Sequence, residues 1–278
     1  MIVLFPLFAN STFAATIQVP ADQPTINAAM IAANNGDTIL VANGTYNGPF
    51  VINKAVVLTS EYINSNNQLD IQNTVLQMAG AGTVVTIDAV AGNTNRLIGF
   101  RIIGGAVGVD NSADGGIRDN QIINNPIGIE IQNNAGGTLE DNIFLLNNIA
   151  GIRVGDAQNV LIDDNFFQQN GDAIQWIGDG SGTIANNDIG NQFGVGIFLS
   201  GLPQLSIEAN DINNNQSDGI RIQLSNATVA GTPDFSIRNN EIHNNPQDGI
   251  KIIDNIGAGA ADVRFWIERN IIYNNAAA

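Results

Sequence analysis

The sequence predicts an all-β solenoid, a parallel β-helix of about nine to ten coils, from three observations. An aliphatic residue, two variable residues and an asparagine recur from residue 117 onward, at spacings of 22 or 23 and then 30 residues. Within each unit the apolar residues alternate with a period of two, as they do in strands. Steps rich in Asn and Gly interrupt these runs about every five residues. Such a unit indicates one coil of three short strands.

The repeat contains two rows of polar residues, the second five positions after the first. We expect each row to hydrogen-bond along its own column, because equivalent residues of stacked coils lie about 4.8 Å apart. Asparagine also tolerates the left-handed backbone conformation, so the rows are expected to supply that conformation at the corners. The rows are Asn120, Asn142, Asn165, Asn187, Asn210, Asn240 and Asn270, then Asn125, Asn147, Asn170, Gln192, Asn215, Asn245 and Asn275.

Residues 1–14 read MIVLFPLFANSTFA, an apolar stretch that ends in small residues. This pattern predicts a secretory signal cleaved after Ala14, with Thr12 and Ala14 at the small-residue positions. The usual basic start is missing, since the first lysine is Lys54. No later run of about 18 apolar residues predicts a membrane span. We therefore expect a secreted or cell-surface protein in which residues 15–278 form a single domain.

An amphipathic helix is predicted over residues 25–34, ahead of the regular repeats of residues 117–275. Its apolar positions Ile26, Ala29 and Met30 share one face, which can cover the open edge of the first coil. A strand is expected from Thr38, and apolar stretches between residues 50 and 105 suggest two or three less regular coils. The two spacings of 30 place inserted loops at Ala227–Asp234 and Ile256–Asp262.

Composition excludes several classes of function. Ten Lys and Arg residues against 26 Asp and Glu give a formal charge of -16, which argues against nucleic acid as a partner. The chain has no cysteine and one histidine, His243, so thiolate chemistry and multi-histidine zinc sites are excluded. A polyanionic substrate requires a cation or a local basic patch, and no organic cofactor is expected.

The stretch GDTILVANGTYNGPFVIN, followed by repeated NxIxNN…GIxI units, resembles the parallel β-helix proteins of the pectin-lyase-like group over residues 17–275. The resemblance implies a right-handed coil. It also implies polysaccharide as the partner, although the group includes lyases, hydrolases, epimerases and proteins without known chemistry. The hydrolase triplets GHG, GDD and RIK and the epimerase-type DPH are absent from the chain.

One outward column carries carboxylates in three successive coils: Asp188, Asp211 and Glu241. Like charges about 5 Å apart repel each other by about 1 kcal/mol at high dielectric. We expect a bound cation such as calcium, or the nearby Arg238, to offset this repulsion. The alternative is a solvated acidic stripe that prevents aggregation.

The next outward column contains Asn213, His243 and Tyr273. His243 and Tyr273 flank the carboxylates and suit general acid–base chemistry at a uronic-acid carbon, with Asn213 as a substrate contact. Trp266 is predicted to point outward and either stack on a sugar ring or pack against a C-terminal cap. The alternative for His243 is an ordinary exposed histidine.

A third column places Arg221 and Lys251 in neighbouring coils, each three residues after an aspartate, Asp218 or Asp248. The resemblance implies a role as catalytic base, because lyases of the group commonly use Arg or Lys beside calcium-binding aspartates. The alternative is a pair of salt bridges between turns.

Two functions remain open from the sequence. One is a polysaccharide lyase or epimerase acting on uronic-acid polymers. A glycosidase that uses Asp188 and Glu241 fits the columns less well. The other is a non-catalytic structural or surface solenoid. The sequence given stops within a repeat at IIYNNAAA, so we expect a further segment, a partner or self-association at this end.

Overall fold

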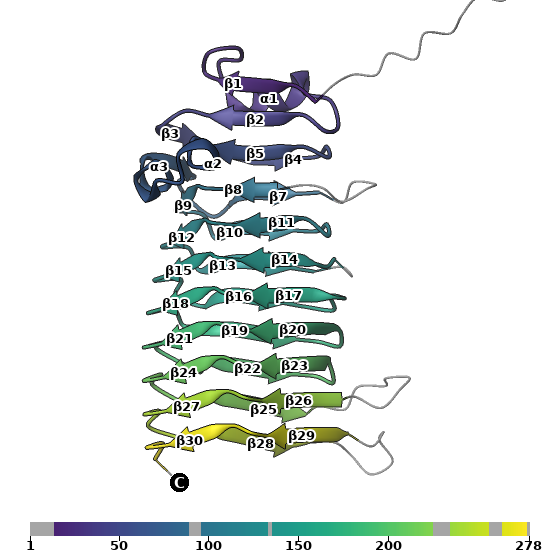
Figure 1. The fold of residues 1–278 in the computed structure, drawn as a ribbon, viewed down its shortest axis with the longest axis vertical. Helices are drawn as coiled ribbons and strands as arrows, with labels where there is room; N and C mark the ends of the chain where they lie inside the picture. The colour runs from purple at the N-terminus through teal and green to yellow at the C-terminus, as the bar shows by residue number, and fades with distance from the viewer. Residues whose placement is uncertain (1–13, 89–95, 133–134, 225–233, 256–262, 277–278) are drawn as a thin grey trace, which may run out of the picture.

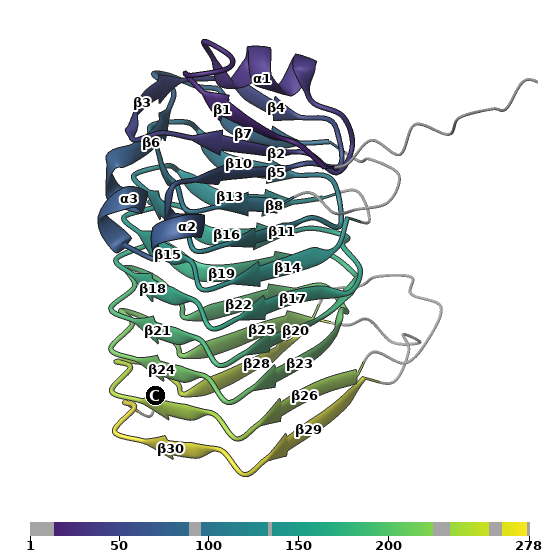
Figure 2. The same cartoon turned by 45° about the horizontal axis from the view of Figure 1, so that its top comes forward.

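In the computed structural model, described for residues 14–88, 96–132, 135–224, 234–255 and 263–276, the strands form three parallel sheets (Figure 1). From its second strand onward the chain passes through the three sheets, here called A, B and C, in turn, and each passage adds one strand beside the previous one (Figure 2). One coil thus consists of three strands, as β17 (Val160–Asp163), β18 (Phe166–Gln168) and β19 (Asp172–Ile177) illustrate. This architecture confirms the predicted parallel β-helix.

The three sheets contain 11, 10 and 9 strands within the described residues. Sheet A consists of β1 (Thr16–Val19), β2 (Thr38–Val41), β5 (Val57–Ser60), β8 (Arg96–Ile98), β11 (Gly116–Arg118), β14 (Gly137–Glu140), β17 (Val160–Asp163), β20 (Ser181–Ala185), β23 (Gln204–Glu208), β26 (Asp234–Arg238) and β29 (Arg264–Glu268). Sheet B consists of β3 (Gly44–Asn47), β6 (Thr74–Gln77), β9 (Arg101–Ile103), β12 (Gln121–Ile123), β15 (Ile143–Leu145), β18 (Phe166–Gln168), β21 (Asp188–Gly190), β24 (Asp211–Asn213), β27 (Glu241–His243) and β30 (Ile271–Tyr273). Sheet C consists of β4 (Phe50–Ile52), β7 (Thr83–Ile87), β10 (Val107–Asn111), β13 (Ile127–Ile131), β16 (Ala150–Val154), β19 (Asp172–Ile177), β22 (Ile197–Ser200), β25 (Ile220–Leu224) and β28 (Ile250–Asp254).

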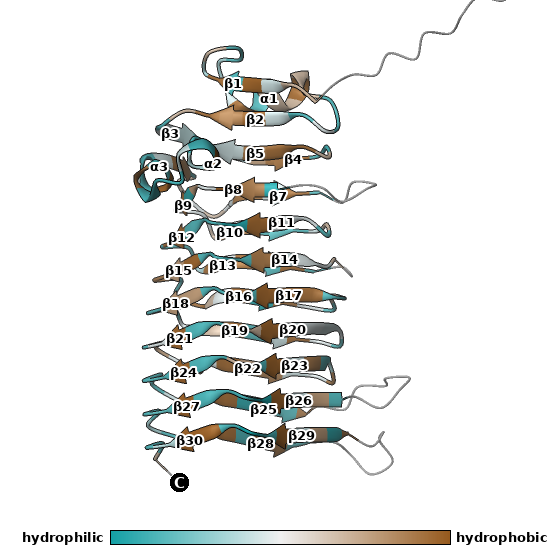
Figure 3. Ribbon diagram, viewed as in Figure 1, coloured by the Kyte–Doolittle hydropathy of each residue, from teal (hydrophilic) through white to brown (hydrophobic). Residues whose placement is uncertain are grey.

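The core consists of apolar rows that point into the coil from all three sheets. Phe144 and Phe167 of sheet B are fully buried and stack with ring centroids 4.7 Å apart. Trp176 of sheet C is also fully buried. The strands are largely hydrophobic in Figure 3, whereas many turns are hydrophilic. Because successive side chains of a strand point to opposite sides, every second residue faces the core and the others form the outward columns.

The polar rows lie at the turns between sheets, buried except for the half-buried Asn270 and Asn275 of the last coil, and their side chains bond along the columns as predicted. Asn147, for example, donates to Ile122 O and to Asn170 Oδ1, both at 2.9 Å, and its own Oδ1 accepts from Asn125 N at 3.1 Å. Each side chain therefore satisfies backbone groups of a neighbouring coil that water does not reach.

The predicted backbone conformation of these rows was wrong. The left-handed conformation falls on the residue before each row member, for instance Leu146, Ala209 and Arg269, with φ of 58°, 56° and 57°. Row residues must direct their amides into the column, so the turn is made one position earlier, where the side chain points outward. Leucine, alanine and arginine rarely adopt a positive φ. They adopt it here because the hydrogen bonds of the following asparagine fix the turn.

The helix α1 (Ile26–Ala32) covers the N-terminal end of the solenoid against β1, β2 and β4, as predicted (Figure 1). Thr25 caps it by accepting from Ala28 N at 3.1 Å. Two further helices, α2 (Tyr62–Ser65) and α3 (Gln68–Asn73), were not predicted, because they are short and bury only Ile71. The predicted signal, over its residues 1–13, and nearly all of the two inserted loops lie outside the described residues.

Candidate functional site

The structure distributes the predicted site residues over three outward faces and does not bring them into one site. Sheet B carries Asp188, Asp211, Asn213, Glu241, His243 and Tyr273, sheet C carries Arg221 and Lys251, and sheet A carries Trp266. Because the three sheets form different sides of the coil, these groups belong to separate surfaces.

The acidic row on sheet B has the predicted register, with Asp188 opposite Asp211 and Asp211 opposite Glu241. Burial, and then the neighbouring Asp211 charge, raise the pKa of Asp188. Asp211 Oδ1 accepts from Asn213 Nδ2 at 2.9 Å and lies 3.2 Å from His243 Nε2. Asn213 and His243 thus hold Asp211 in place, while the repulsion that Asp211 exerts on Asp188 remains.

The prediction that Arg238 offsets the charge repulsion in this row was wrong. Arg238 lies on sheet A, and its Nε is 3.2 Å from Glu208 Oε2. In the part of the chain that the structure describes, no group of three or more His, Cys, Asp or Glu side chains is arranged to hold a metal ion. Calcium binding at Asp188, Asp211 and Glu241 stays a prediction.

His243 and Tyr273 lie against each other beside the acidic row. Their rings stack with centroids 4.9 Å apart, and Tyr273 Oη donates to Glu241 Oε1 at 2.8 Å. This hydrogen bond is the main reason why the pKa of Tyr273 is raised, so the phenol keeps its proton at neutral pH. Asn244 Nδ2 lies 2.9 Å from His243 Nδ1. An amide nitrogen only donates, so Nδ1 accepts and Nε2–H faces Asp211.

The row on sheet C combines charged, polar and aromatic side chains in the predicted register. Arg221 Nε lies 2.5 Å from Oδ2 of the buried Asp218, and Lys251 Nζ lies 3.1 Å from Asp248 Oδ2. These contacts are the ion pairs of the alternative reading, and a catalytic role for Arg221 and Lys251 stays a prediction. Asp218 also accepts from Asp248 N at 3.0 Å, which links the two pairs across neighbouring coils. The row is Asp110, Glu130, Arg153, Gln175, Phe198, Arg221 and Lys251.

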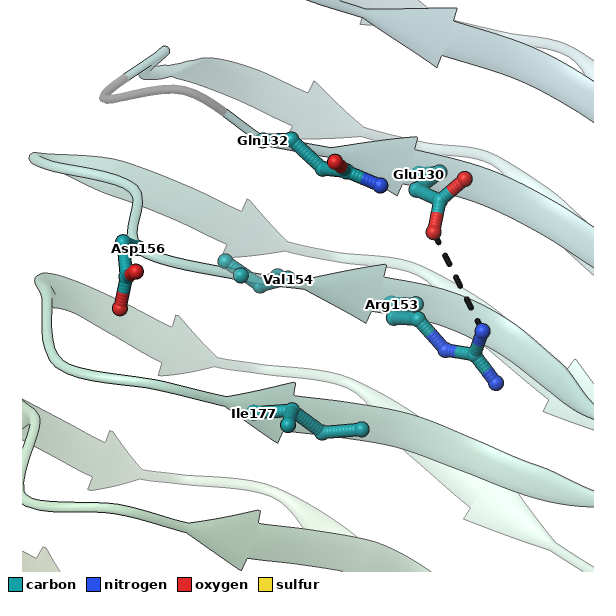
Figure 4. A pocket seen from close by; sticks show the side chains of 7 residues that line it. Glu130, Gln132, Arg153, Val154, Asp156 and Ile177 are labelled. Carbon is teal, nitrogen blue, oxygen red and sulfur yellow. Dashed lines mark ion pairs between the residues drawn. The ribbon is translucent and has the colours of Figure 1, made fainter.

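Arg153 is a third cation held in place on this face, and the sequence analysis did not assign it to the site. Arg153 Nε donates to Gln175 Oε1 at 3.1 Å, and Gln175 Nε2 donates to Asp172 Oδ2 at 2.8 Å. A terminal nitrogen of Arg153 lies 4.0 Å from Glu130 Oε1 (Figure 4). The guanidinium is therefore held between the strands on either side of β16.

Two open hollows follow the sheet C row. One, of about 630 Å³, is lined by Glu130, Gln132, Arg153, Val154, Gly155, Asp156 and Ile177 (Figure 4). The other, of about 420 Å³, is lined by Asp172, Gln175, Phe193, Gly194, Val195, Phe198, Gln216, Ser217 and Arg221. The sequence signal for this face was the pair of cations in neighbouring coils, Arg221 and Lys251. Phe193 gave no such signal, because it lies in a turn outside the strand pattern.

Trp266 is 60% exposed and stands opposite Ser236, so the predicted outward position is confirmed. On β30, Ile271 and Ile272 are 62% and 47% exposed. Self-association through this strand stays a prediction. Among the described residues no helix is long and apolar enough to cross a membrane.

Among the solved structures that the chain resembles are an alginate lyase, a pectin methylesterase and a mannuronan epimerase. An alginate lyase from Paenibacillus sp. str. FPU-7 aligns with a TM-score of 0.66 at 15% identity, over 95% of this chain and 99% of the lyase. Pectin methylesterase PemA from Erwinia chrysanthemi gives 0.49 at 14% identity, over 96% and 92%. The mannuronan C-5 epimerase AlgE4 A-module of Azotobacter vinelandii gives 0.44 at 14% identity, over 92% and 94%.

No curated protein sequence matches the chain. The family model of the right-handed β-helix region matches residues 105–255, which span most of the regular coils. This match also confirms the right hand that the resemblance implied. On the match and the three parallel sheets together, the chain belongs to the right-handed β-helix family.

Proposed function

We propose that this protein binds an acidic polysaccharide along the outward face of sheet C. The observation that carries the proposal is the row of braced cations, Arg153, Arg221 and Lys251, beside two hollows on one sheet. Similarity of fold to an alginate lyase favours polysaccharide as the class of ligand.

The overall charge of -16 repels a polyanion at long range, so recognition depends on local positive groups. Arg153 and Arg221 lie three strands apart, about 14 Å at the usual strand spacing. A chain lying across the strands therefore meets Arg153, Arg221 and Lys251 in succession. Phe193, 54% exposed, lies in the hollow before Arg221 and offers an apolar surface for a sugar ring.

Replacing Arg153 and Lys251 together with glutamine is expected to weaken binding of alginate or polygalacturonate by about 100-fold. Each lost charge-assisted contact to a carboxylate accounts for about tenfold. Titration calorimetry at low salt measures the change. Arg238→Gln removes a matched charge from sheet A and is expected to leave binding unchanged. An equal loss in that control, or wild-type binding of a neutral polymer with the same affinity, contradicts the proposal.

A second candidate function is lyase or epimerase chemistry on sheet B, favoured by the adjacent pairs His243–Asp211 and Tyr273–Glu241. In an elimination, His243 Nδ1 exchanges its bond with Asn244 for the substrate and takes the proton from the uronic-acid carbon, while the C–O bond to the leaving sugar breaks. The phenol, kept protonated by Glu241, gives its proton to the leaving oxygen. Asn213, bonded to Asp211, lies at the same surface as a substrate contact.

This second candidate predicts that His243→Ala and Tyr273→Phe each lower turnover by about 100-fold with little change in substrate affinity. Ultraviolet absorbance of the unsaturated product, measured over a panel of uronic-acid polymers, follows the reaction. Full activity in both variants would transfer the proposed base to Lys251 or Arg221. If no polymer gives a product, the protein is a solenoid that binds polysaccharide without catalysis.

Under either function we propose that the protein is exported, with residues 1–14 as its signal.

A further inference from the structure

Asp37 is a buried carboxylate at the N-terminal end of the solenoid. It is 5% exposed, and its two oxygens accept from Ala15 N at 2.7 Å and from Asn34 N at 2.8 Å. The bond from Ala15, followed by the one from Asn34, lowers the pKa of Asp37 below its ordinary value of 3.8. Lys54, whose charge also acts on Asp37, donates its hydrogen bonds to the carbonyls of Ile31 and Ala33 instead.

Ala15 is the residue through which the chain joins the sheet. Its carbonyl accepts from Thr38 N at 2.8 Å, and β1 begins at the next residue, with Thr16 opposite Thr38. The Ala14–Ala15 bond is also the predicted signal cleavage site, where Thr12 and Ala14 are the small residues required. The nitrogen that cleavage would release is therefore the atom that Asp37 already contacts.

We propose that cleavage after Ala14 creates an α-ammonium group at Ala15 that forms an ion pair with Asp37 and holds β1 on the sheet. This inference rests on the export that we propose above. An endopeptidase of the signal-peptidase class adds water across the peptide bond, so Ala14 leaves with a carboxylate and Ala15 keeps the ammonium.

The change at Ala15 is from one neutral donor to three donors with a full positive charge. The existing bond is already strengthened by the charge of the Asp37 carboxylate, and the ammonium adds the attraction of a full opposite charge. A buried carboxylate gains most from a charged donor, because little water competes for it. In the uncleaved chain the same position holds a neutral peptide group. Processing would therefore complete the N-terminal end of the fold as well as remove the signal.

The test compares two purified chains, one beginning at Ala15 and one with a single glycine added before it. The glycine moves the ammonium away from Asp37 and restores a peptide N–H at Ala15. At pH 6.5 we expect the chain that begins at Ala15 to melt about 2–4 °C higher. In Asp37→Asn, which keeps an acceptor oxygen and removes the charge, the difference between the two chains should vanish.

The difference should also depend on pH in a defined direction. An α-amino group in an unfolded chain has a pKa of about 8, and a neighbouring carboxylate raises this pKa in the folded chain. The extra stability is therefore fully present below about pH 7 and is lost as pH rises through the folded value. The separate contribution of the lowered Asp37 pKa is present above 3.8 and is lost as pH falls through the folded value.

Equal melting temperatures for the two chains would overturn the ion pair. If Asp37→Asn fails to fold, the acetylation rate of the α-amine decides, because pairing should slow it in the chain that begins at Ala15. N-terminal sequencing of the full-length precursor after export from a secreting host tests the cleavage separately. A first residue other than Ala15 would overturn the processing site, whatever the melting data show.

Discussion

Replacing Asn147 with alanine is expected to lower the free energy of unfolding by about 3–5 kcal/mol. The side chain is fully buried and donates to Ile122 O and Asn170 Oδ1, while its oxygen accepts from Asn125 N. Alanine leaves these buried partners without hydrogen bonds and opens a gap in the row. The loss affects the coils on both sides, because each solenoid coil is stabilised by its neighbours.

The adjacent Asn148 supplies a matched control, since it is the same residue type but exposed. Asn148→Ala is expected to change stability by less than about 0.5 kcal/mol. Urea denaturation followed by far-ultraviolet circular dichroism measures both variants. Equal effects would show that the buried row contributes no more than the surface of the turn.

Phe167→Ala is expected to cost about 3–5 kcal/mol, the range for emptying a large aromatic site in a core. Phe167 is fully buried and stacks on Phe144, so its removal leaves a cavity between stacked coils. The neighbouring Phe166 lies on the outward face at 38% exposure. Phe166→Ala is expected to cost about 1 kcal/mol or less. Thermal and urea unfolding of the pair measures the contrast, and similar losses would contradict the assigned inward and outward faces.

Periodicity was sufficient for the parallel β-helix and for the register of every column that carries a candidate residue, whereas the right hand followed from the resemblance. In a parallel β-helix each coil contacts the coils beside it, so a regular repeat in sequence becomes a regular stack in space. The pairs Asp211–Glu241 and Arg221–Lys251 followed from counting residues, and the structure has both. The helix α1 was likewise predictable, because its apolar face has a helical period.

The candidate site was less predictable, because a column position does not specify which partner a side chain selects. Arg238 belongs to the same repeat unit as Glu241, yet its guanidinium pairs with Glu208 on sheet A. Arg153 is positioned by a hydrogen bond to Gln175, which lies 22 residues later in the chain, in the neighbouring coil. Long side chains reach across strands, and their partners depend on rotamers and on the hollows between them.

The sequence by itself thus determined the solenoid, its inward rows and the order of residues along each outward face, since these depend only on local period. The tertiary structure alone decided that His243 and Arg221 lie on different sheets, and that the left-handed residue precedes each polar row. It also placed Asp37 against Ala15 N, 22 residues earlier in the chain. These outcomes depend on how a coil bends at its corners, because hydrogen bonds between coils select one backbone turn among several that the local sequence allows.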